Sequence, residues 1–228
     1  DCPNELELSE ASWAGDGDVF LRAEDDNTDD FGCDCAALTQ GVDFNGEVNG
    51  TQLERVKTGD LEEAYIVFRR SAAEVAGCSG WFFGAGNIIN LWLAKPEGDG
   101  WAAHWVTDLY FETAGLDSGF DEREAPHSVA VSEERGYDWY AYQMRIEGFP
   151  EYWEKTEQPD GSTEWVIDLK ALLARGADYS GRDLSDYYWY YVDVVSEDIC
   201  NEGVIGESYA QQRIHYFEIK LKLKDDRR

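Results

Sequence analysis

The sequence is short of basic residues. It has 19 Lys and Arg against 48 Asp and Glu, for a formal net charge of −29. Phosphate binding depends on clustered Lys and Arg, so this charge argues against nucleic acid as a partner. It disfavours an anionic membrane surface for the same reason. No apolar run approaches the roughly 20 residues that a membrane-spanning helix needs, so we expect no membrane span. An acidic surface suits cations, neutral ligands or a high-salt habitat, and it also serves plain solubility.

Histidine and cysteine are few and scattered. The three histidines form no H-E-x-x-H pair, and the five cysteines include no pair of C-x-x-C units, which argues against a zinc site. The sequence also lacks a P-loop, a G-x-G-x-x-G loop and a G-x-S-x-G elbow. Two disulfides with one thiol left over is typical of a secreted protein, and their pairing stays open. The chain begins at Asp1, consistent with a removed leader, so we predict a secreted or cell-surface protein.

Aromatic and β-branched residues are plentiful, and they alternate with polar ones. This pattern predicts strands separated by Gly-, Pro- and Asp-rich turns, including a hairpin over 87–112 and a short helix over 169–175. We therefore predict an all-β protein, an antiparallel two-sheet β-sandwich of jelly-roll type with one short helix. No linker or repeat divides the chain, so 1–228 is interpreted as a single domain with an acidic, loop-rich segment at 1–60.

The last predicted strand, "RIHYFEIKLKLK", alternates cleanly. His215 shares one face with Phe217 and Ile219, which predicts a core histidine with its polar atoms satisfied. Polysaccharide lyases use residue types such as Gln212, Arg213, His215 and Tyr216, but an acidic chain would repel a polyuronate.

The stretch "SDYYWYYVDVV" places five aromatic residues in a row. If the face with Val192 and Val194 is buried, the opposite face carries Tyr187, Trp189, Tyr191 and Asp193. Alternate residues of a strand stand roughly 6.8 Å apart, the scale on which sugar rings follow one another in a glycan. The stretch predicts a sugar-binding platform. The alternative is that these rings fill the core or lie beneath a covering segment.

The predicted strand "WAAHWVTDLYFE" brings chemistry-bearing residues to one face. The alternation aligns His104, Asp108, Tyr110 and Glu112. A glycoside hydrolase needs such a carboxylate pair, one as acid and one as nucleophile or base. With 48 acidic residues in the chain, the pairing can also arise by chance.

The segment "EDDNTDDFG" carries oxygen donors at close intervals. Asp25, Asn27, Asp29 and Asp30 are the ligand types that Ca²⁺ prefers, although the EF-hand pattern is absent. We predict a structural Ca²⁺ site here. A solvated acidic loop is the alternative.

Part of the second half resembles a known group of sandwiches. The order "YQMRIEG", "PDGSTEWVIDLKALL" and "YYWYYVDVV" is similar to that of family 9 carbohydrate-binding modules and the related DOMON domains. Those domains are β-sandwiches in which tryptophans hold a sugar. The resemblance implies that role for Trp189 together with Trp92, Trp105 or Trp153.

The sequence thus predicts a secreted domain that binds a polysaccharide or oligosaccharide without necessarily cleaving it. The first alternative is a polysaccharide-degrading enzyme on the same fold, a glycoside hydrolase or lyase. The second is a calcium-dependent surface or adhesion protein.

Overall fold

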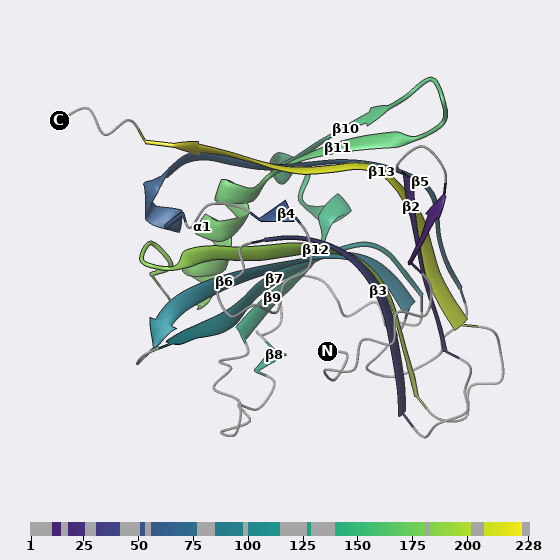
Figure 1. Cartoon of the computed structure of the whole chain (residues 1–228), viewed down its shortest axis with the longest axis horizontal. Helices are drawn as coiled ribbons and strands as arrows, with labels where there is room; N and C mark the ends of the chain where they lie inside the picture. Colours follow the sequence, from purple (N-terminus) through teal and green to yellow (C-terminus); the bar gives the residue numbers. More distant parts are fainter. Residues whose placement is uncertain are drawn as a thin grey trace.

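Two curved β-sheets lie one above the other, with a single helix at one end (Figure 1). The computed structural model describes residues 11–14, 18–25, 31–41, 51–52, 56–76, 85–97, 100–114, 127–128, 140–180, 183–201 and 208–224. The predicted all-β sandwich of jelly-roll type with one helix is therefore confirmed.

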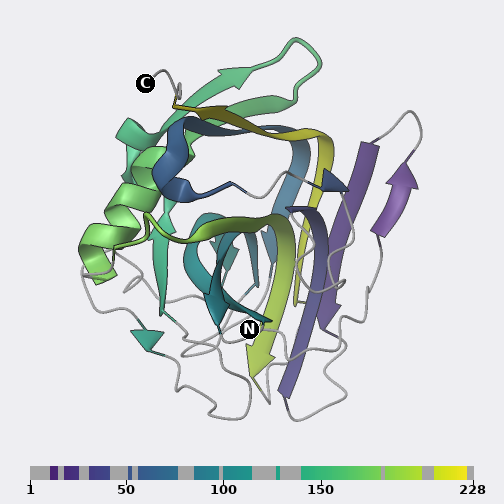
Figure 2. The ribbon, with the colours of Figure 1, turned by 60° about the vertical axis from the view of Figure 1, so that its left-hand side comes forward.

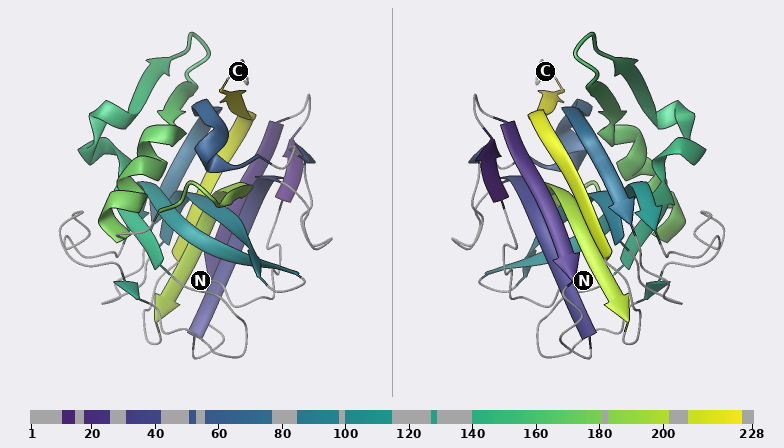
Figure 3. Two further views of the ribbon diagram at one scale, coloured as in Figure 1. Left: turned by 90° about the vertical axis from the view of Figure 1, so that its left-hand side faces the viewer. Right: turned by 90° about the vertical axis from the view of Figure 1, so that its right-hand side faces the viewer.

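The first sheet, here the outer sheet, has the strand order β1-β2-β13-β5-β11-β10, and all its neighbours are antiparallel. The two views of Figure 3 show β2, β13 and β5 side by side. The strands of this sheet are β1 (Ala11–Ala14), β2 (Asp18–Asp25), β5 (Leu61–Ala76), β10 (Trp153–Glu157), β11 (Thr163–Asp168) and β13 (Ser208–Leu223).

The second sheet, here the inner sheet, has the order β4-β3-β12-β6-β7-β9-β8. Its centre is antiparallel, and among the described strands the two parallel pairs are β3 with β4 and β7 with β9. The predicted 87–112 hairpin is confirmed as β6–β7. The strands of this sheet are β3 (Phe31–Gly41), β4 (Thr51–Gln52), β6 (Ala85–Glu97), β7 (Gly100–Ala114), β8 (His127–Ser128), β9 (Tyr140–Arg145) and β12 (Tyr188–Asn201).

The hydrophobic core lies between the two sheets, because alternate residues of each central strand point toward the other sheet. The core is built mainly from β-branched and leucine side chains, which the period-two pattern places on one side of each strand. Representative members are Leu21, Ile66, Phe68, Ile89, Leu91, Val192, Val194, Ile214 and Ile219.

The helix α1 (Leu169–Ser180) closes one end of the core beside β10 and β11, as Figure 2 shows. It begins where predicted, since the Asp168 carboxylate accepts a hydrogen bond from the Ala171 N–H at 2.9 Å and caps the first turn. Leu169, Leu172 and Leu173 point into the core. Three short 3₁₀ turns complete the described structure: η1 (Thr58–Asp60), η2 (Ile146–Gly148) and η3 (Pro150–Tyr152). Within the described residues, no helix is long and apolar enough to cross a membrane.

β-Bulges interrupt the alternation of the central strands. In β12 the pairing with β6 shifts between Trp189 and Tyr191, and in β13 the pairing with β5 shifts between Ile214 and Tyr216. A bulge inserts one residue and moves the following side chains to the other face. The alternation predicted from the sequence therefore fails at these points. The loop-rich interpretation of 1–60 did not anticipate the length of β3, which has 11 residues.

Candidate functional site

The candidate site lies on the face of the inner sheet that points away from the outer sheet. In β12, Val192 and Val194 are buried in the core, so Asp193 between them points to the opposite face, where it is half-buried. In β6, Ile89 and Leu91 are core residues, and half-buried Asn90 points the same way as Asp193. Figure 1 shows this face on the inside of the bend of the sheet.

Two acidic residues occupy one row across this face. Asp193 of β12 pairs with Asn90 of β6, and Asn90 pairs with Asp108 of β7. Paired residues of neighbouring strands share a face, so the backbone places Asp108 on the same side of the sheet as Asp193. Neighbouring strands lie about 4.8 Å apart, so two strand spacings put these backbones roughly 9.6 Å apart. An amide-bearing residue thus separates two acidic positions.

The adjacent row is aromatic. Tyr191 of β12 pairs with Trp92 of β6, which pairs with Trp105 of β7. Along β6, Trp92 follows Asn90 by two residues, so the rows are neighbours on one face, roughly 6.8 Å apart. The sequence predicted a platform running along one strand. The aromatic positions on this face run across three strands instead.

On the other side of the acidic row, the same face carries apolar residues. Ile88 pairs with Val195 on one side and with Tyr110 on the other, and all three are buried although they lie outside the core cluster. The acidic row is therefore bordered by an aromatic row and a buried apolar row.

The predicted sugar-binding platform of Tyr187, Trp189, Tyr191 and Asp193 is wrong for two of its four residues. Trp189 is 0% exposed and Tyr187 is 7% exposed, and both belong to the core cluster. The cause is the bulge between Trp189 and Tyr191, which puts Trp189 on the same side as Val192. A ring sealed in the core cannot stack on a sugar. Tyr191 and Asp193, beyond the bulge, keep the face that was predicted for them.

The bulges of β7 separate the predicted catalytic residues. Tyr110 pairs with Ile88 but Glu112 pairs with Asn87, so the register shifts between them and Glu112 turns toward the outer sheet. Glu112 is therefore not on the face of Asp108, contrary to prediction. His104 pairs with the core residue Leu93, so the backbone places it on the other side of the sheet from Asp108, also contrary to prediction.

Trp153 is far from this face. It lies on β10 of the outer sheet, packs on Trp165 at a centroid distance of 4.8 Å, and donates its indole N–H to the Ile146 carbonyl at 2.6 Å. These contacts give it a structural role at the edge of the core.

The calcium prediction falls on residues whose side chains lie outside the described part of the chain. Asp25 is the last residue of β2, and Asn27, Asp29 and Asp30 are not described. Among the residues that the structure does describe, no cluster of three metal-ligating side chains occurs. The Ca²⁺ site stays a prediction, as do the disulfides, because no cysteine side chain is described.

The comparisons with known proteins support the fold alone. No family model matches the chain, and no curated protein matches it. Among solved structures, the chain is similar to a family 12 xyloglucanase from Bacillus licheniformis in complex with ligand, with a TM-score of 0.51 and 10% identity over 93% of this chain and 84% of that one. The native form of that enzyme gives a TM-score of 0.50 and 10% identity over 93% and 91%.

A third similar structure is the endoglucanase cel12A from Rhodothermus marinus, with a TM-score of 0.47 and 14% identity over 91% of this chain and 83% of that one. The two matches with a TM-score of at least 0.50 show the jelly-roll fold alone, because their identity is 10%. The resemblance to family 9 carbohydrate-binding modules stays a prediction. The segments "TEWVIDLKALL" and "YYWYYVDVV", on which the resemblance rests, lie in β11, α1 and β12, except for Tyr187 just before β12.

Sequence reasoning missed Asn90, the central residue of the acidic row. Its one signal was a polar residue inside the otherwise apolar stretch "IINLWLA". A polar residue between buried leucine and isoleucine neighbours marks the side of a strand that faces away from the core.

Proposed function

We propose that this chain is a glycoside hydrolase that cleaves a neutral polysaccharide on the concave face of the inner sheet. The observation that carries the proposal is the row Asp193–Asn90–Asp108, in which two acidic residues flank one strand. The similar solved structures with a TM-score of at least 0.5 are named as xyloglucanase, which supports a polysaccharide of the glucan class as substrate.

The proposed chemistry needs two carboxylates with different roles. One protonates the oxygen of the leaving sugar, and the other acts on the anomeric carbon or on the attacking water. Glycosidases hold these carboxyl groups about 5 to 9.5 Å apart. The roughly 9.6 Å between the backbones of Asp108 and Asp193 lies at the upper end of that range. Asn90 between them is suited to bind a sugar hydroxyl.

The neighbouring aromatic row supplies the binding surface in this proposal. Trp92, with the positions of Tyr191 and Trp105 beside it, offers flat faces for the C–H faces of sugar rings. The net charge of −29 favours a neutral glycan and works against a polyuronate, so a hydrolase is preferred here to a lyase.

The test is release of reducing sugar from xyloglucan, β-1,4-glucan and xylan. We expect hydrolysis of at least one of them by the unaltered chain. Asp193→Asn and Asp108→Asn should each lower kcat by about 10² to 10⁴, because each removes an acid–base group. Asp186→Asn is the matched control, since Asp186 is an exposed carboxylate that precedes the same strand and pairs with Lys57. It should retain full activity.

A carbohydrate-binding domain without catalysis would give a different result. Affinity electrophoresis would then show retardation by a polysaccharide that the chain does not hydrolyse, and the hydrolase proposal would fail. Repeating both measurements with a chelator tests whether the predicted Ca²⁺ site matters for binding or hydrolysis. Size-exclusion chromatography with and without Ca²⁺ tests the alternative of a calcium-dependent adhesion protein. Secretion also stays part of the proposal.

A further inference from the structure

A second constellation lies on the opposite side of the molecule, on the exposed face of the outer sheet. Ser71 of β5, His215 of β13 and Asp18 of β2 form one chain of hydrogen bonds. The Ser71 hydroxyl lies 2.7 Å from Nε2 of His215, and Nδ1 of His215 lies 2.9 Å from the Asp18 carboxylate. The strands β2, β13 and β5 are consecutive in the outer sheet. Residues that are at least 53 positions apart in the sequence therefore meet in one place.

The direction of these hydrogen bonds follows from chemistry. An ionised carboxylate only accepts, so Nδ1 of His215 carries the proton and donates it to Asp18. In the neutral imidazole, Nε2 is then an acceptor, and the Ser71 hydroxyl donates to it. This is the tautomer in which a histidine can remove the serine proton, and the carboxylate holds the ring in that orientation.

All three residues face away from the core. Arg70 and Phe68 of β5 point inward, so Ser71 points outward; Val19 of β2 is a core residue, so Asp18 points outward. His215 reaches them because of the bulge between Ile214 and Tyr216. The prediction that His215 lies in the core is therefore wrong, while both of its ring nitrogens have partners as expected. The His215 and Asp18 side chains are 14% and 29% exposed, and Ser71 is half-buried, so a ligand can reach the group.

The backbone beside Ser71 is strained. Ala72 has φ 49°, a left-handed conformation that a non-glycine residue adopts at a cost of about 1 kcal/mol or more. A second bulge lies here, because the pairing passes from Arg213↔Ser71 to Gln211↔Glu74 and leaves two residues of β5 opposite Gln212. Bulges re-aim the side chains beside them, and strained backbone positions cluster at active sites.

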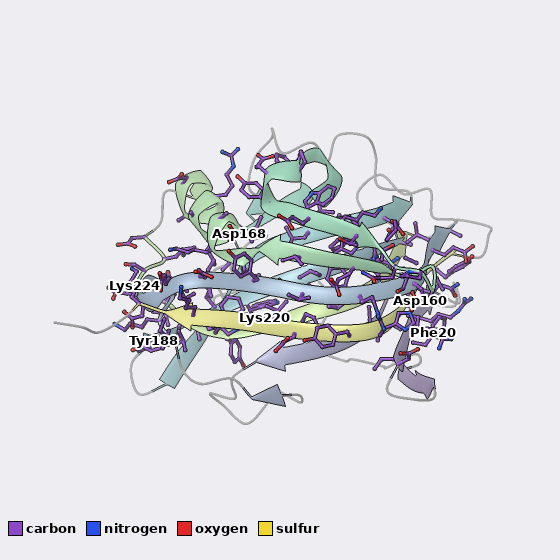
Figure 4. The ribbon with its side chains drawn as sticks, turned by 90° about the horizontal axis from the view of Figure 1, so that it is seen from above. Phe20, Asp160, Asp168, Tyr188, Lys220 and Lys224 are labelled. Atoms are coloured by element: carbon purple, nitrogen blue, oxygen red, sulfur yellow. The ribbon has the colours of Figure 1, made fainter. Side chains whose placement is uncertain are left out.

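Two arginines lie beside this group in an otherwise acidic chain, and the Asp160 carboxylate interacts electrostatically with Arg69 and His215. Arg213 is the register partner of Ser71 and lies over the Phe20 ring at 5.6 Å, and Arg69 follows on the same face of β5. Neither guanidinium forms an ion pair with a carboxylate of the described residues, and Nε of Arg69 is buried without a hydrogen-bond partner there. Figure 4 shows Phe20 and Asp160 at this end of the outer sheet, far from Lys224.

We propose that Ser71, His215 and Asp18 form an acyl-transfer site that hydrolyses carboxylic esters, separate from the concave face. Ser71 Oγ attacks the ester carbonyl carbon while its proton passes to Nε2 of His215. The bond to the alcohol oxygen breaks, and that oxygen takes the proton from His215. Water then attacks the acyl-serine in the same way, which releases the carboxylic acid and restores Ser71.

In this scheme Ser71 and His215 are catalytic residues, and Asp18 is a positioning residue. A guanidinium can stabilise the negative charge on the carbonyl oxygen during attack, and Arg213 opposite Ser71 is the candidate for that role. The activity goes beyond the proposed glycoside hydrolase and does not depend on it.

The test treats the full chain with a fluorophosphonate, which bonds to an activated serine with loss of fluoride. We expect one adduct per chain by intact mass, located at Ser71 by peptide mapping. Ser71→Ala should abolish the adduct and lower p-nitrophenyl acetate hydrolysis by about 10²-fold or more. Ser185→Ala is the control, because Ser185 is exposed, and it should label at Ser71 as before.

Asp18→Asn separates positioning from a purely structural role. We expect the labelling rate of Ser71 to fall by about 10²-fold with an unchanged melting temperature, and Asp18→Glu to restore part of it. The proposal is overturned if the unaltered chain is not labelled by the fluorophosphonate, or if the adduct lies on another residue. This outcome does not depend on whether any variant folds. Ser71→Ala should keep polysaccharide hydrolysis, and Asp193→Asn should keep ester hydrolysis, so the two proposals fail independently.

Discussion

Arg70 on β5 donates two hydrogen bonds to the carboxylate of Glu112 on β7, at 2.7 and 2.5 Å, and so joins the two sheets through the interior. Arg70 is buried, and its guanidinium lies 4.6 Å from the Phe111 ring centroid. Asn87 donates to the same carboxylate at 3.2 Å and accepts from Ser196 at 2.9 Å. A network with its buried members paired in this way fixes how the sheets stack.

Removing Glu112 should destabilise the protein more than removing an exposed carboxylate. Glu112→Ala leaves the Arg70 guanidinium buried without its main partner, and we expect a loss of about 2 to 4 kcal/mol in the free energy of unfolding, reduced somewhat because Glu112 is about one-third exposed. Urea denaturation measures it. The control is Glu63→Ala, which breaks the exposed pair with Lys222 and should cost at most about 1 kcal/mol. Equal losses would contradict the assigned role.

The fold was predictable because its signals are local. Turns such as the one around Gly161 and the alternation of "EAYIVF" or "TEWVID" are set by neighbouring residues, and the Asp168 cap begins the helix where the sequence indicates. The faces of long strands were less predictable. Each bulge shifts the alternation by one residue, and nothing in "YYWYYV" or "RIHYF" marks where it occurs.

The sites were unpredictable for a second reason. Both depend on which strands are neighbours, and β12 lies beside β6 although about 100 residues separate them in sequence. The row of Asp193, Asn90 and Asp108 comes from three strands, and so does the group of Ser71, His215 and Asp18. A single-strand analysis finds Asp193, Asp108 and His215 but cannot say which residues of other strands lie beside them.

Trp92 should contribute to polysaccharide binding rather than to the chemical step. Trp92→Ala removes an indole ring from the aromatic row, next to Asn90. We expect KM for the hydrolysed polysaccharide to rise about tenfold, which corresponds to about 1.4 kcal/mol. We expect kcat to change much less. Steady-state kinetics on the soluble polysaccharide measures this. Trp92→Phe keeps a flat ring and should recover most of the affinity. A fall in kcat at constant KM would place Trp92 in the reaction instead.

Asp168 should stabilise α1 as its N-cap. Asp168→Ala removes the acceptor of the Ala171 N–H, and we expect a loss of about 1 kcal/mol in the free energy of unfolding. Thermal or urea denaturation followed by circular dichroism measures it. Asp178→Ala is the control, because Asp178 is exposed on the same helix beyond the first turn, and it should change stability by less than about 0.5 kcal/mol.

The β10–β11 turn should show a pH dependence centred on Asp160. The side-chain and backbone hydrogen bonds from Ser162 lower the pKa of the Asp160 carboxyl below its usual 3.8. Because the folded pKa is the lower one, the stabilising contribution is present above the unfolded pKa and is lost as the pH falls through the folded value. An NMR titration of the Asp160 carboxyl carbon should give a midpoint below 3.8. Ser162→Ala removes the side-chain hydrogen bond, the first cause of the shift, and should move the midpoint back toward the usual value. An unchanged midpoint would mean that the Ser162 hydroxyl does not hold this carboxylate in solution.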